Sequence, residues 1–351
     1  MAKTKIAING FGRIGRSFFR VAYERPELDI VAVNDLGNPQ NLAYLLTYDS
    51  AYGRAPFKIE VGSQNNKPVF VLDGKKTIFF TSQKEPRLLP WKELGIDIVI
   101  EASGVFDDFE KSKPHLQAGA KRVVITAPVK DEPIGIQGGT VLMGVNEEKL
   151  KTCDISSNAS CTTNAASPLI AILHENIGIY KALLNTTHSY TATQSLVDGA
   201  VKDHDFRRGR AAAHNIIPSH TGAAIAVTKA FPALDGLFDG IAIRVPTITG
   251  SITDITFLAK RDVTAEEVNN ILRKAADEER WKRVFAVTEE PIVSSDIVGS
   301  KYASIADLSF TRVVGGNLVK VIAWYDNEMG YTYSLVEHVI KSGQYLLEDQ
   351  K

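Results

Sequence analysis

The sequence predicts an α/β protein of two domains: a doubly wound parallel sheet followed by an α+β domain with a mainly antiparallel sheet. Two observations support this fold class. Over the first 150 residues, short and nearly continuous apolar runs alternate with stretches of helical spacing, which is typical of parallel strands covered on both faces. In the second half, long runs alternate apolar and polar residues, which is typical of an antiparallel sheet with one covered face.

The elements of the first half follow in order. Strands are predicted at 5–9, 29–34, 96–103 and 122–126, because these runs are short, apolar and rich in β-branched residues. A helix is predicted at 13–23, and helix-like material separates the later strands. Strands joined through helices pair in parallel.

The second half begins with a predicted helix at 167–176, where Pro168 lies just inside the start, as helix starts favour. Alternating strand runs follow at 240–260, 304–316 and 318–326, and a last helix is predicted at 330–347. The segment 191–221 has no clear period, and loops of this length inside compact proteins are commonly functional. We expect a first domain of residues 1–159, completed by the C-terminal helix within 328–351, and a second domain of 160–327.

Composition excludes several classes of protein. Lys plus Arg (40) nearly cancels Asp plus Glu (41), so nucleic-acid binding is not indicated. No run of about 18 apolar residues predicts a membrane span, and the N-terminus lacks the apolar core of a secretory signal. The 2 cysteines and 7 scattered histidines suggest neither a disulfide scaffold nor a metal site. A cytoplasmic protein is expected.

A glycine-rich turn follows the first strand. The strand at 5–9 runs into Gly10-Phe11-Gly12-Arg13-Ile14-Gly15, which opens the predicted helix, and Asp35 ends the next strand. In a Rossmann-type domain, such a turn brings backbone and a helix N-terminus to a pyrophosphate, and the acidic residue binds the ribose hydroxyls. Asp35 would also repel a 2′-phosphate. The pattern therefore predicts NAD as cofactor, although a strand–helix turn with no ligand is the simpler alternative.

The run NASCTTNAASP (158–168) places Cys161 before helical material. A thiolate at a helix N-terminus is stabilised by free amides and by the helix dipole. His188, at the end of a short strand-like run, is the candidate base. From the residues alone, Cys161 remains open to other interpretations: a buried small hydrophobe, or half of a disulfide with Cys153. His188 is equally open to a purely structural role.

The two features together indicate one reaction type. An aldehyde carbon is trigonal and donates no hydride readily, whereas thiolate addition makes it tetrahedral and alkoxide-like. Hydride then leaves to NAD, and the product is a thioester. A nicotinamide-binding domain followed by a cysteine nucleophile therefore favours oxidation of an aldehyde through a thiohemiacetal.

With these motifs, the chain resembles the phosphorylating, glycolytic type of the glyceraldehyde-3-phosphate dehydrogenase family. The matching motifs follow the family's order between Lys5 and Gln344: INGFGRIGR, SNASCTTN, HSYTATQ, RRGRAAAHNIIPSHTGAA, RVPT and WYDNEMGY. The resemblance implies Cys161 as the thiol, His188 as its activator, glyceraldehyde 3-phosphate and inorganic phosphate as substrates, and a homotetramer.

Two phosphate dianions require arginines and hydroxyl donors. By resemblance, the substrate and phosphate positions are Ser160, Thr162, Thr191, Thr221, Gly222 and Arg244. The cofactor positions are Gly10, Gly12, Arg13, Ile14, Gly15, Asp35, Lys84, Thr126 and Asn327. Which arginine of 207–210 contributes is open, and so are the effects of Ile225, where lysine is usual, and of the longer loop at 127–146.

Three alternatives remain at this stage. Ala200 stands where strictly NAD-dependent members of the family commonly have proline, which leaves use of both NAD and NADP open. Asp35-Leu36 instead resembles the NAD-specific type. A related phosphosugar aldehyde such as erythrose 4-phosphate is the alternative substrate. A cysteine hydrolase or acyltransferase on a borrowed dinucleotide scaffold is the alternative of a different class, and it would need no nicotinamide.

Overall fold

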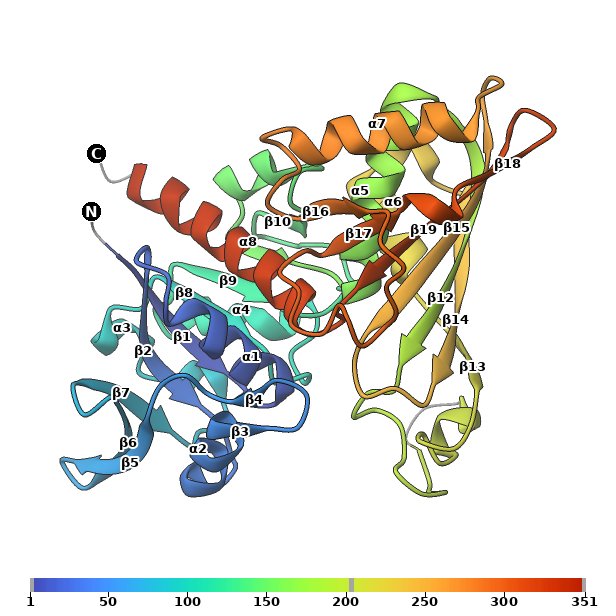
Figure 1. Ribbon diagram of the computed structural model, residues 1–351. Coiled ribbons are helices and arrows are strands. Elements are labelled where there is room, and N and C mark those ends of the chain that lie inside the picture. The colour runs from blue at the N-terminus through green and yellow to red at the C-terminus, as the bar shows by residue number, and fades with distance from the viewer. Residues whose placement is uncertain (1–2, 202–204, 349–351) are drawn as a thin grey trace. The chain divides into compact units, whose positions relative to one another are not determined.

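The computed structural model describes residues 3–201 and 205–348, which form two compact units (Figure 1). The first unit comprises the described parts of Met1–Val141, Glu147–Ala159 and Leu335–Lys351, and the second comprises those of Leu142–Asn146 and Ser160–Ser334. Residues 142–146 and 328–334 thus belong to the second unit, whereas the sequence placed them in the first domain.

The first unit is built on a sheet in the order β10-β11-β9-β8-β1-β2-β7-β6-β5. All neighbours pair in parallel except β5, β6 and β7, which form an antiparallel edge. The strands are β1 (Thr4–Asn9), β2 (Leu28–Asn34), β5 (Ile59–Gln64), β6 (Lys67–Leu72), β7 (Lys76–Thr81), β8 (Ile98–Glu101), β9 (Arg122–Ile125), β10 (Gly138–Thr140) and β11 (Ile155–Ser157). The small pair β3 (Tyr48–Asp49) and β4 (Gly53–Arg54) lies outside this sheet.

Helical segments cover this sheet on both faces. They are α1 (Arg13–Ala22), α2 (Pro39–Thr47), α3 (Trp91–Leu94), α4 (Phe109–Gln117), the C-terminal part of α8 (Met329–Glu348), and the 3₁₀ turns η1 (Pro86–Leu88) and η2 (Glu147–Lys151). On one face, Ala7 and Val99 form a buried cluster with Trp91. On the other face, Ile8 packs against α1 at Gly15, where an added Cβ would lie 3.2 Å from the isoleucine side chain.

The second unit is built on a sheet in the order β13-β14-β12-β15-β19-β17-β16, with β18 paired to β19. Five of the strand pairs are antiparallel, whereas β12–β14 and β16–β17 are parallel, so the mainly antiparallel character predicted from the sequence is confirmed. The strands are β12 (Ile179–Ser189), β13 (Ile217–His220), β14 (Phe238–Val245), β15 (Ser251–Ala259), β16 (Phe285–Thr288), β17 (Ser304–Asp307), β18 (Arg312–Val314) and β19 (Leu318–Tyr325).

The helical segments of this unit are α5 (Cys161–Asn176), α6 (Ala223–Ala230), α7 (Ala265–Asp277), η3 (Phe206–Gly209), η4 (Pro232–Leu234) and η5 (Leu308–Phe310). The predicted start of α5 was wrong: the helix begins at Cys161 and contains Pro168 in its interior. Every residue from Thr162 to Leu173 is buried, and this packing offsets the hydrogen bond that a proline inside a helix loses.

Three further predictions need correction. The alternating run 240–260 is divided by the turn 246–250 into β14 and β15, and the run 304–316 is divided by η5 into β17 and β18. The segment 191–221 contains η3 and β13. Among residues 3–201 and 205–348, no helix is long and apolar enough to cross a membrane.

Candidate active site

A cavity of about 420 Å³ opens in the first unit at the ends of β1, β2 and β8. Four of the predicted cofactor residues line it: Gly10, Gly12, Asp35 and Lys84. Its other walls are Asn9, Asn34, Leu36, Gln83, Glu85, Ala102, Ser103, Val105 and Phe106. Because the carboxyl ends of parallel strands form the ligand site of doubly wound sheets, this cavity is the candidate dinucleotide site.

The backbone of this cavity requires glycine at two places. Gly10 has φ +92°, and a Cβ there would lie 2.4 Å from Ser103 Cα. A Cβ on Gly15 would lie 2.1 Å from the Gly10 carbonyl oxygen. Helix α1 begins with no side-chain cap and no acidic residue in its first turn, so its amides are available to an anion. Around Gly12 there is open space, and the arrangement therefore fits a bound pyrophosphate.

Asp35 is fixed by two backbone amides. The Phe11 amide donates to Oδ2 at 2.6 Å, and the Gly37 amide donates to Oδ1 at 2.7 Å. The carboxylate is therefore held beside the glycine-rich turn, and Leu36 next to it is exposed. This place, after the second strand of a doubly wound sheet, is where a ribose-binding carboxylate is expected.

The other predicted cofactor residues lie around this framework or in the second unit. Arg13 pairs with Asp49, and half-buried Ile14 follows it in α1. Thr126 follows β9 and donates through Oγ1 to the Glu101 carbonyl at 3.0 Å. Asn327 belongs to the second unit, where its Oδ1 accepts from Ser251 Oγ and the Gly250 amide. The Asn327 amide nitrogen is therefore the group left to donate to a ligand.

The candidate nucleophile is the first residue of α5. Ser160 is the N-cap of this helix, and its Oγ accepts from the Thr163 amide at 3.1 Å. Ala159, just before the cap, has φ +54°, which is a strained conformation for a residue with a Cβ. The sequence therefore delivers Cys161 to a helix N-terminus, where it is half-buried. Both Cys161 and Cys153 are free thiols.

Strand register brings the candidate base to this thiol. His188 on β12 is opposite Arg244 on the parallel strand β14. His188 Nε2 lies 3.3 Å from Cys161 Sγ. Arg244 Nη1 lies 2.9 Å from His188 Nδ1 and donates to the Ser189 carbonyl at 3.1 Å. The three groups thus form one cluster of thiol, imidazole and guanidinium.

The electrostatics of the cluster favour the neutral pair when no ligand is present. Burial raises the pKa of the Cys161 thiol above its usual value, and the Arg244 cation and Thr162 hydrogen bonds oppose this rise only in part. Burial, followed by the Arg244 charge, lowers the pKa of His188 to about 3. The helix N-terminus therefore stabilises a thiolate as expected, but burial outweighs it.

A buried hydroxyl network underneath the cluster was missed by the sequence analysis. The Tyr325 hydroxyl lies 2.9 Å from Thr162 Oγ1 and 2.7 Å from Thr186 Oγ1, and its ring meets the His188 ring edge-on. The signals in the sequence were only that Tyr325 lies near the end of the predicted strand 318–326 and within the motif WYDNEMGY. The network connects α5, β12 and β19, so it fixes the first turn of α5 against the strand that carries His188.

The three arginines of 207–210 have different partners in the structure. Arg207 pairs with Asp205, and Arg210 pairs with Asp198. Arg208 instead donates to Ser219 Oγ at 3.0 Å. Its charge lowers the pKa of His188, after the larger effects of burial and the Arg244 charge, and it also lowers the pKa of Arg244, on which burial has the largest effect. Arg208 is therefore the arginine of this segment whose charge acts on the thiol cluster.

The remaining predicted substrate positions lie on loops and helix starts of the same unit. Thr191 follows β12, and its hydroxyl lies 3.0 Å from that of Thr193. Thr221 Oγ1 accepts from the Ala223 amide, and Gly222 is the uncapped N-cap of α6. No hydrogen bond between described residues joins these three to Cys161 or His188. They supply hydroxyl and amide donors without carboxylates.

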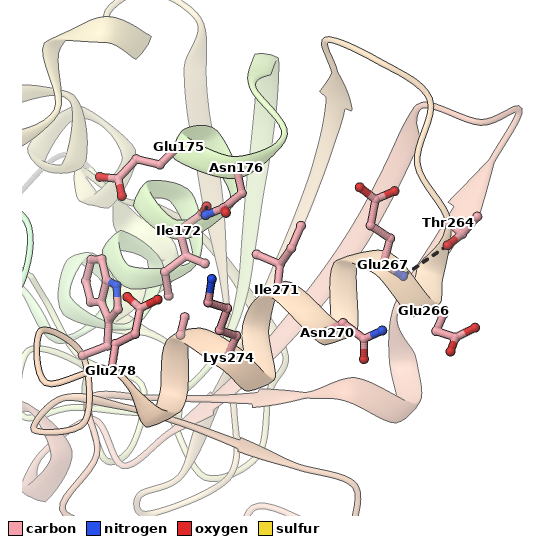
Figure 2. Close-up of a pocket in the computed structure, with 12 residues that line it drawn as sticks. Ile172, Glu175, Asn176, Thr264, Glu266, Glu267, Asn270, Ile271, Lys274 and Glu278 are labelled. Carbon is pink, nitrogen blue, oxygen red and sulfur yellow. Dashed lines mark hydrogen bonds between the residues drawn. The ribbon is translucent and has the colours of Figure 1, made fainter.

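A second cavity, of about 510 Å³, lies on α5 and α7 (Figure 2). Glu175, Lys274 and Trp281 are among its lining residues, and none of the predicted site residues is. Within residues 3–201 and 205–348, no group of three or more His, Cys, Asp or Glu side chains is arranged to hold a metal ion.

Comparison with known proteins gives a consistent result. The model for the NAD binding domain of glyceraldehyde 3-phosphate dehydrogenase matches residues 4–109, and the model for its C-terminal domain matches residues 160–327. The chain is 45% identical to glyceraldehyde-3-phosphate dehydrogenase of Geobacillus stearothermophilus over 95% of this chain and 96% of the relative. It is 49% identical to the enzyme of Thermotoga maritima, over 95% and 97%, and 46% identical to that of Streptomyces coelicolor, over 97% and 99%. The chain therefore belongs to the glyceraldehyde-3-phosphate dehydrogenase family, and its cofactor is NAD.

Proposed function

We propose that this protein oxidises glyceraldehyde 3-phosphate to 1,3-bisphosphoglycerate with NAD and inorganic phosphate, through a thioester on Cys161. The observation that supports this most directly is the cluster in which Cys161 Sγ lies 3.3 Å from His188 Nε2, with Arg244 beside the imidazole. A nucleophile, a base and a cation for phosphate are the three groups that the reaction requires.

The proposed covalent steps balance as follows. Cys161 sulfur bonds to the aldehyde carbon while the thiol proton passes through His188 Nε2 to the aldehyde oxygen, which becomes the hydroxyl of a thiohemiacetal. The carbon then loses hydride and the hydroxyl loses its proton to His188, which leaves a thioester. Phosphate oxygen attacks that carbon, the carbon–sulfur bond breaks, and the departing sulfur takes the proton held by His188, so that acyl phosphate and a free thiol result.

NAD supplies a hydride acceptor when bound. We assign the cavity of the first unit to its dinucleotide part, with the N-terminus of α1 and the amides after Gly10 and Gly12 at the pyrophosphate. Asp35 is assigned to the ribose hydroxyls. Arg13, Ile14, Gly15, Lys84, Thr126 and Asn327 complete the proposed set.

Arg244 and Arg208 are the proposed cations for the two phosphate groups, and Ser160, Thr162, Thr191, Thr221 and Gly222 supply hydroxyl and amide donors. Arg208 donates to Ser219 Oγ, which in turn donates to Asp205, so this arginine is joined to that carboxylate through a hydroxyl. Arginine is suited to this role because its planar fork matches phosphate oxygens.

The test is the rate of NADH formation from glyceraldehyde 3-phosphate, with and without phosphate or arsenate. We expect sustained turnover only when one of these anions is present, because the thioester otherwise persists on Cys161. Turnover without either anion, at the same rate, would exclude the phosphorylating reaction. Erythrose 4-phosphate, assayed in parallel, distinguishes the alternative substrate by its kcat/KM.

The same proposal includes a homotetramer in the cytoplasm. Both thiols are free, which suits a reducing compartment. Light scattering of the purified protein tests the tetramer, for which a molar mass of four chains is expected.

A further inference from the structure

Glu101 is a buried carboxylate at the end of β8, behind the cavity of the first unit. Its residue is 2% exposed, and no Lys or Arg among the described residues forms an ion pair with it. Four hydrogen-bond donors surround it instead. Asn9 Nδ2 donates to Oε2 at 2.5 Å, and His115 Nε2 lies 3.0 Å from the same oxygen. The Ser103 amide and hydroxyl donate to Oε1 at 2.8 and 2.5 Å.

The protonation of His115 is fixed from its other side. Trp91 Nε1 lies 3.0 Å from His115 Nδ1. An indole N–H only donates, so Nδ1 accepts and carries no proton. The ring proton is therefore on Nε2, which donates it to Glu101. His115 is fully buried, so this neutral tautomer has no solvent contact through which to rearrange.

The groups that Glu101 holds form the wall of the cavity. Asn9 and Ser103 both line it, and Asn9 Oδ1 in turn accepts from Asn34, a third lining residue, at 2.7 Å. The Glu101 carbonyl also accepts from the amide and hydroxyl of Thr126. One residue thus connects the ends of β1, β8 and β9.

The position of Ser103 matters because the chain passes so close to Gly10. A Cβ on Gly10 would lie 2.4 Å from Ser103 Cα, so the two backbone segments are packed so closely that only glycine fits between them. A small displacement of Ser103 would therefore move the glycine-rich turn itself. The hydrogen bonds from Ser103 to Glu101 oppose that displacement, together with the backbone hydrogen bond from the Ala102 amide to the Asn9 carbonyl.

We propose that Glu101 is a positioning residue for NAD, and that Trp91 and His115 act through it by holding its carboxylate in one orientation. The inference rests on the proposed assignment of this cavity to NAD. None of the three residues is proposed to touch the reacting atoms. Their role is to keep Asn9 and Ser103 in the arrangement that the dinucleotide meets.

The chemistry predicts which substitutions are tolerated. Glu101→Gln has nearly the same shape, but its amide group would place two N–H donors against the four donors that surround the site. His115→Gln keeps a donor toward Glu101 and an acceptor toward Trp91. His115→Leu has similar volume and keeps neither, so it leaves buried polar groups unpaired.

The experiment measures the dissociation constant of NAD by titration calorimetry on the full-length protein. We expect Glu101→Gln and His115→Leu to raise it about 10-fold or more, the scale of hydrogen bonds to a charged group, and His115→Gln to raise it no more than about threefold. Trp91→Phe removes only the indole donor and should also raise the dissociation constant of NAD. Trp281→Phe, a buried indole of the second unit, is the matched control and should not.

Alkylation of Cys161 by iodoacetamide without NAD reports on the second unit, and its rate should stay within about twofold of wild type in every variant. A merely structural role would give similar losses for His115→Gln and His115→Leu, and that result would overturn the inference. Unchanged NAD affinity in both Glu101→Gln and His115→Leu would also overturn it. Asp35→Ala distinguishes failure of the Glu101 inference from failure of the assignment of this cavity to NAD. If Asp35→Ala also binds NAD normally, the assignment of the cavity is wrong as well.

Discussion

Arg244 and Ser189 compete for one nitrogen of His188. His188 Nδ1 lies 2.9 Å from Arg244 Nη1 and 2.7 Å from the Ser189 carbonyl oxygen. If Nδ1 accepts from the guanidinium, the proton is on Nε2, and His188 cannot take the Cys161 proton. If Nδ1 donates to Ser189, Nε2 is free to act as a base. The partner that Nδ1 takes therefore determines whether the imidazole can act as a base.

The first prediction concerns Arg244. Arg244→Ala removes the cation proposed for phosphate, so KM for the aldehyde and for inorganic phosphate should each rise about 10-fold or more, the scale of charge-assisted hydrogen bonds. NAD affinity should be unchanged. Steady-state kinetics with each substrate varied in turn measures the effect. Unchanged KM for both phosphorylated partners would contradict the assignment.

Arg208 gives the second prediction. Arg208→Ala should raise at least one of the same two KM values about 10-fold, because it removes an arginine whose charge acts on the cluster. Arg210→Ala is the matched control from the same segment, since its guanidinium is exposed and paired with Asp198. A larger effect of Arg210→Ala than of Arg208→Ala would show that the wrong arginine has been chosen.

The third prediction separates the nucleophile from the base. Cys161→Ala should abolish turnover and leave NAD binding intact. His188→Asn should lower kcat by about 10²–10⁴, because the reaction loses a positioned acid–base group but keeps its thiol. Rapid-mixing measurements of the first turnover check this. If His188→Asn forms NADH at the wild-type rate in that turnover, the imidazole is not the base.

The fourth prediction is a pH dependence of stability. Burial lowers the pKa of His338 to about 3, from 6.5 in an exposed histidine. Between these values the unfolded chain binds the proton and the folded protein does not, so stability is fully present above pH 6.5 and is lost as the pH falls below it. His338 should contribute a slope of about 1.4 kcal/mol per pH unit in that range.

Urea unfolding at several values between pH 5 and pH 7.5 measures this slope, and His338→Gln, which cannot titrate, should reduce it. His188 has a similarly lowered pKa and retains its own contribution in that variant. Equal slopes for wild type and His338→Gln would mean that His338 is protonated in the folded protein.

Candidate site residues could be recognised from the sequence where a chemically informative residue type lies within a local structural motif. The turn at Gly10 and Gly15 and the cysteine at a helix start are local features, so both could be recognised without the fold. The start of α5 was misjudged because Pro168 suggested a first helical position, whereas extensive burial allows it inside the helix. Burial of that kind depends on tertiary contacts and leaves no local signal.

Residues that act through distant partners could not be predicted from the sequence. Glu101 and His115 are in contact although 14 positions separate them in the sequence. Tyr325 and Thr162 are in contact across 163 positions. Arg208 could not be distinguished from Arg207 and Arg210 until their carboxylate partners were visible. Each of these assignments depends on tertiary contacts between different helices, strands and turns, which local sequence patterns do not reveal.

The last prediction concerns the choice between NAD and NADP. The Asp35 carboxylate is held by the Phe11 and Gly37 amides, so it cannot turn away from a 2′-phosphate without breaking two hydrogen bonds. Repulsion between these like charges should make kcat/KM higher with NAD than with NADP. Asp35→Asn keeps the shape and one acceptor but removes the charge, so the preference for NAD should narrow mainly through a lower KM for NADP. Ala200→Pro, which restores the residue common in strictly NAD-dependent members, tests the opposing feature separately. If the wild-type enzyme has a higher kcat/KM with NADP, the Asp35 carboxylate does not determine the cofactor preference, and the segment around Ala200 has the larger effect.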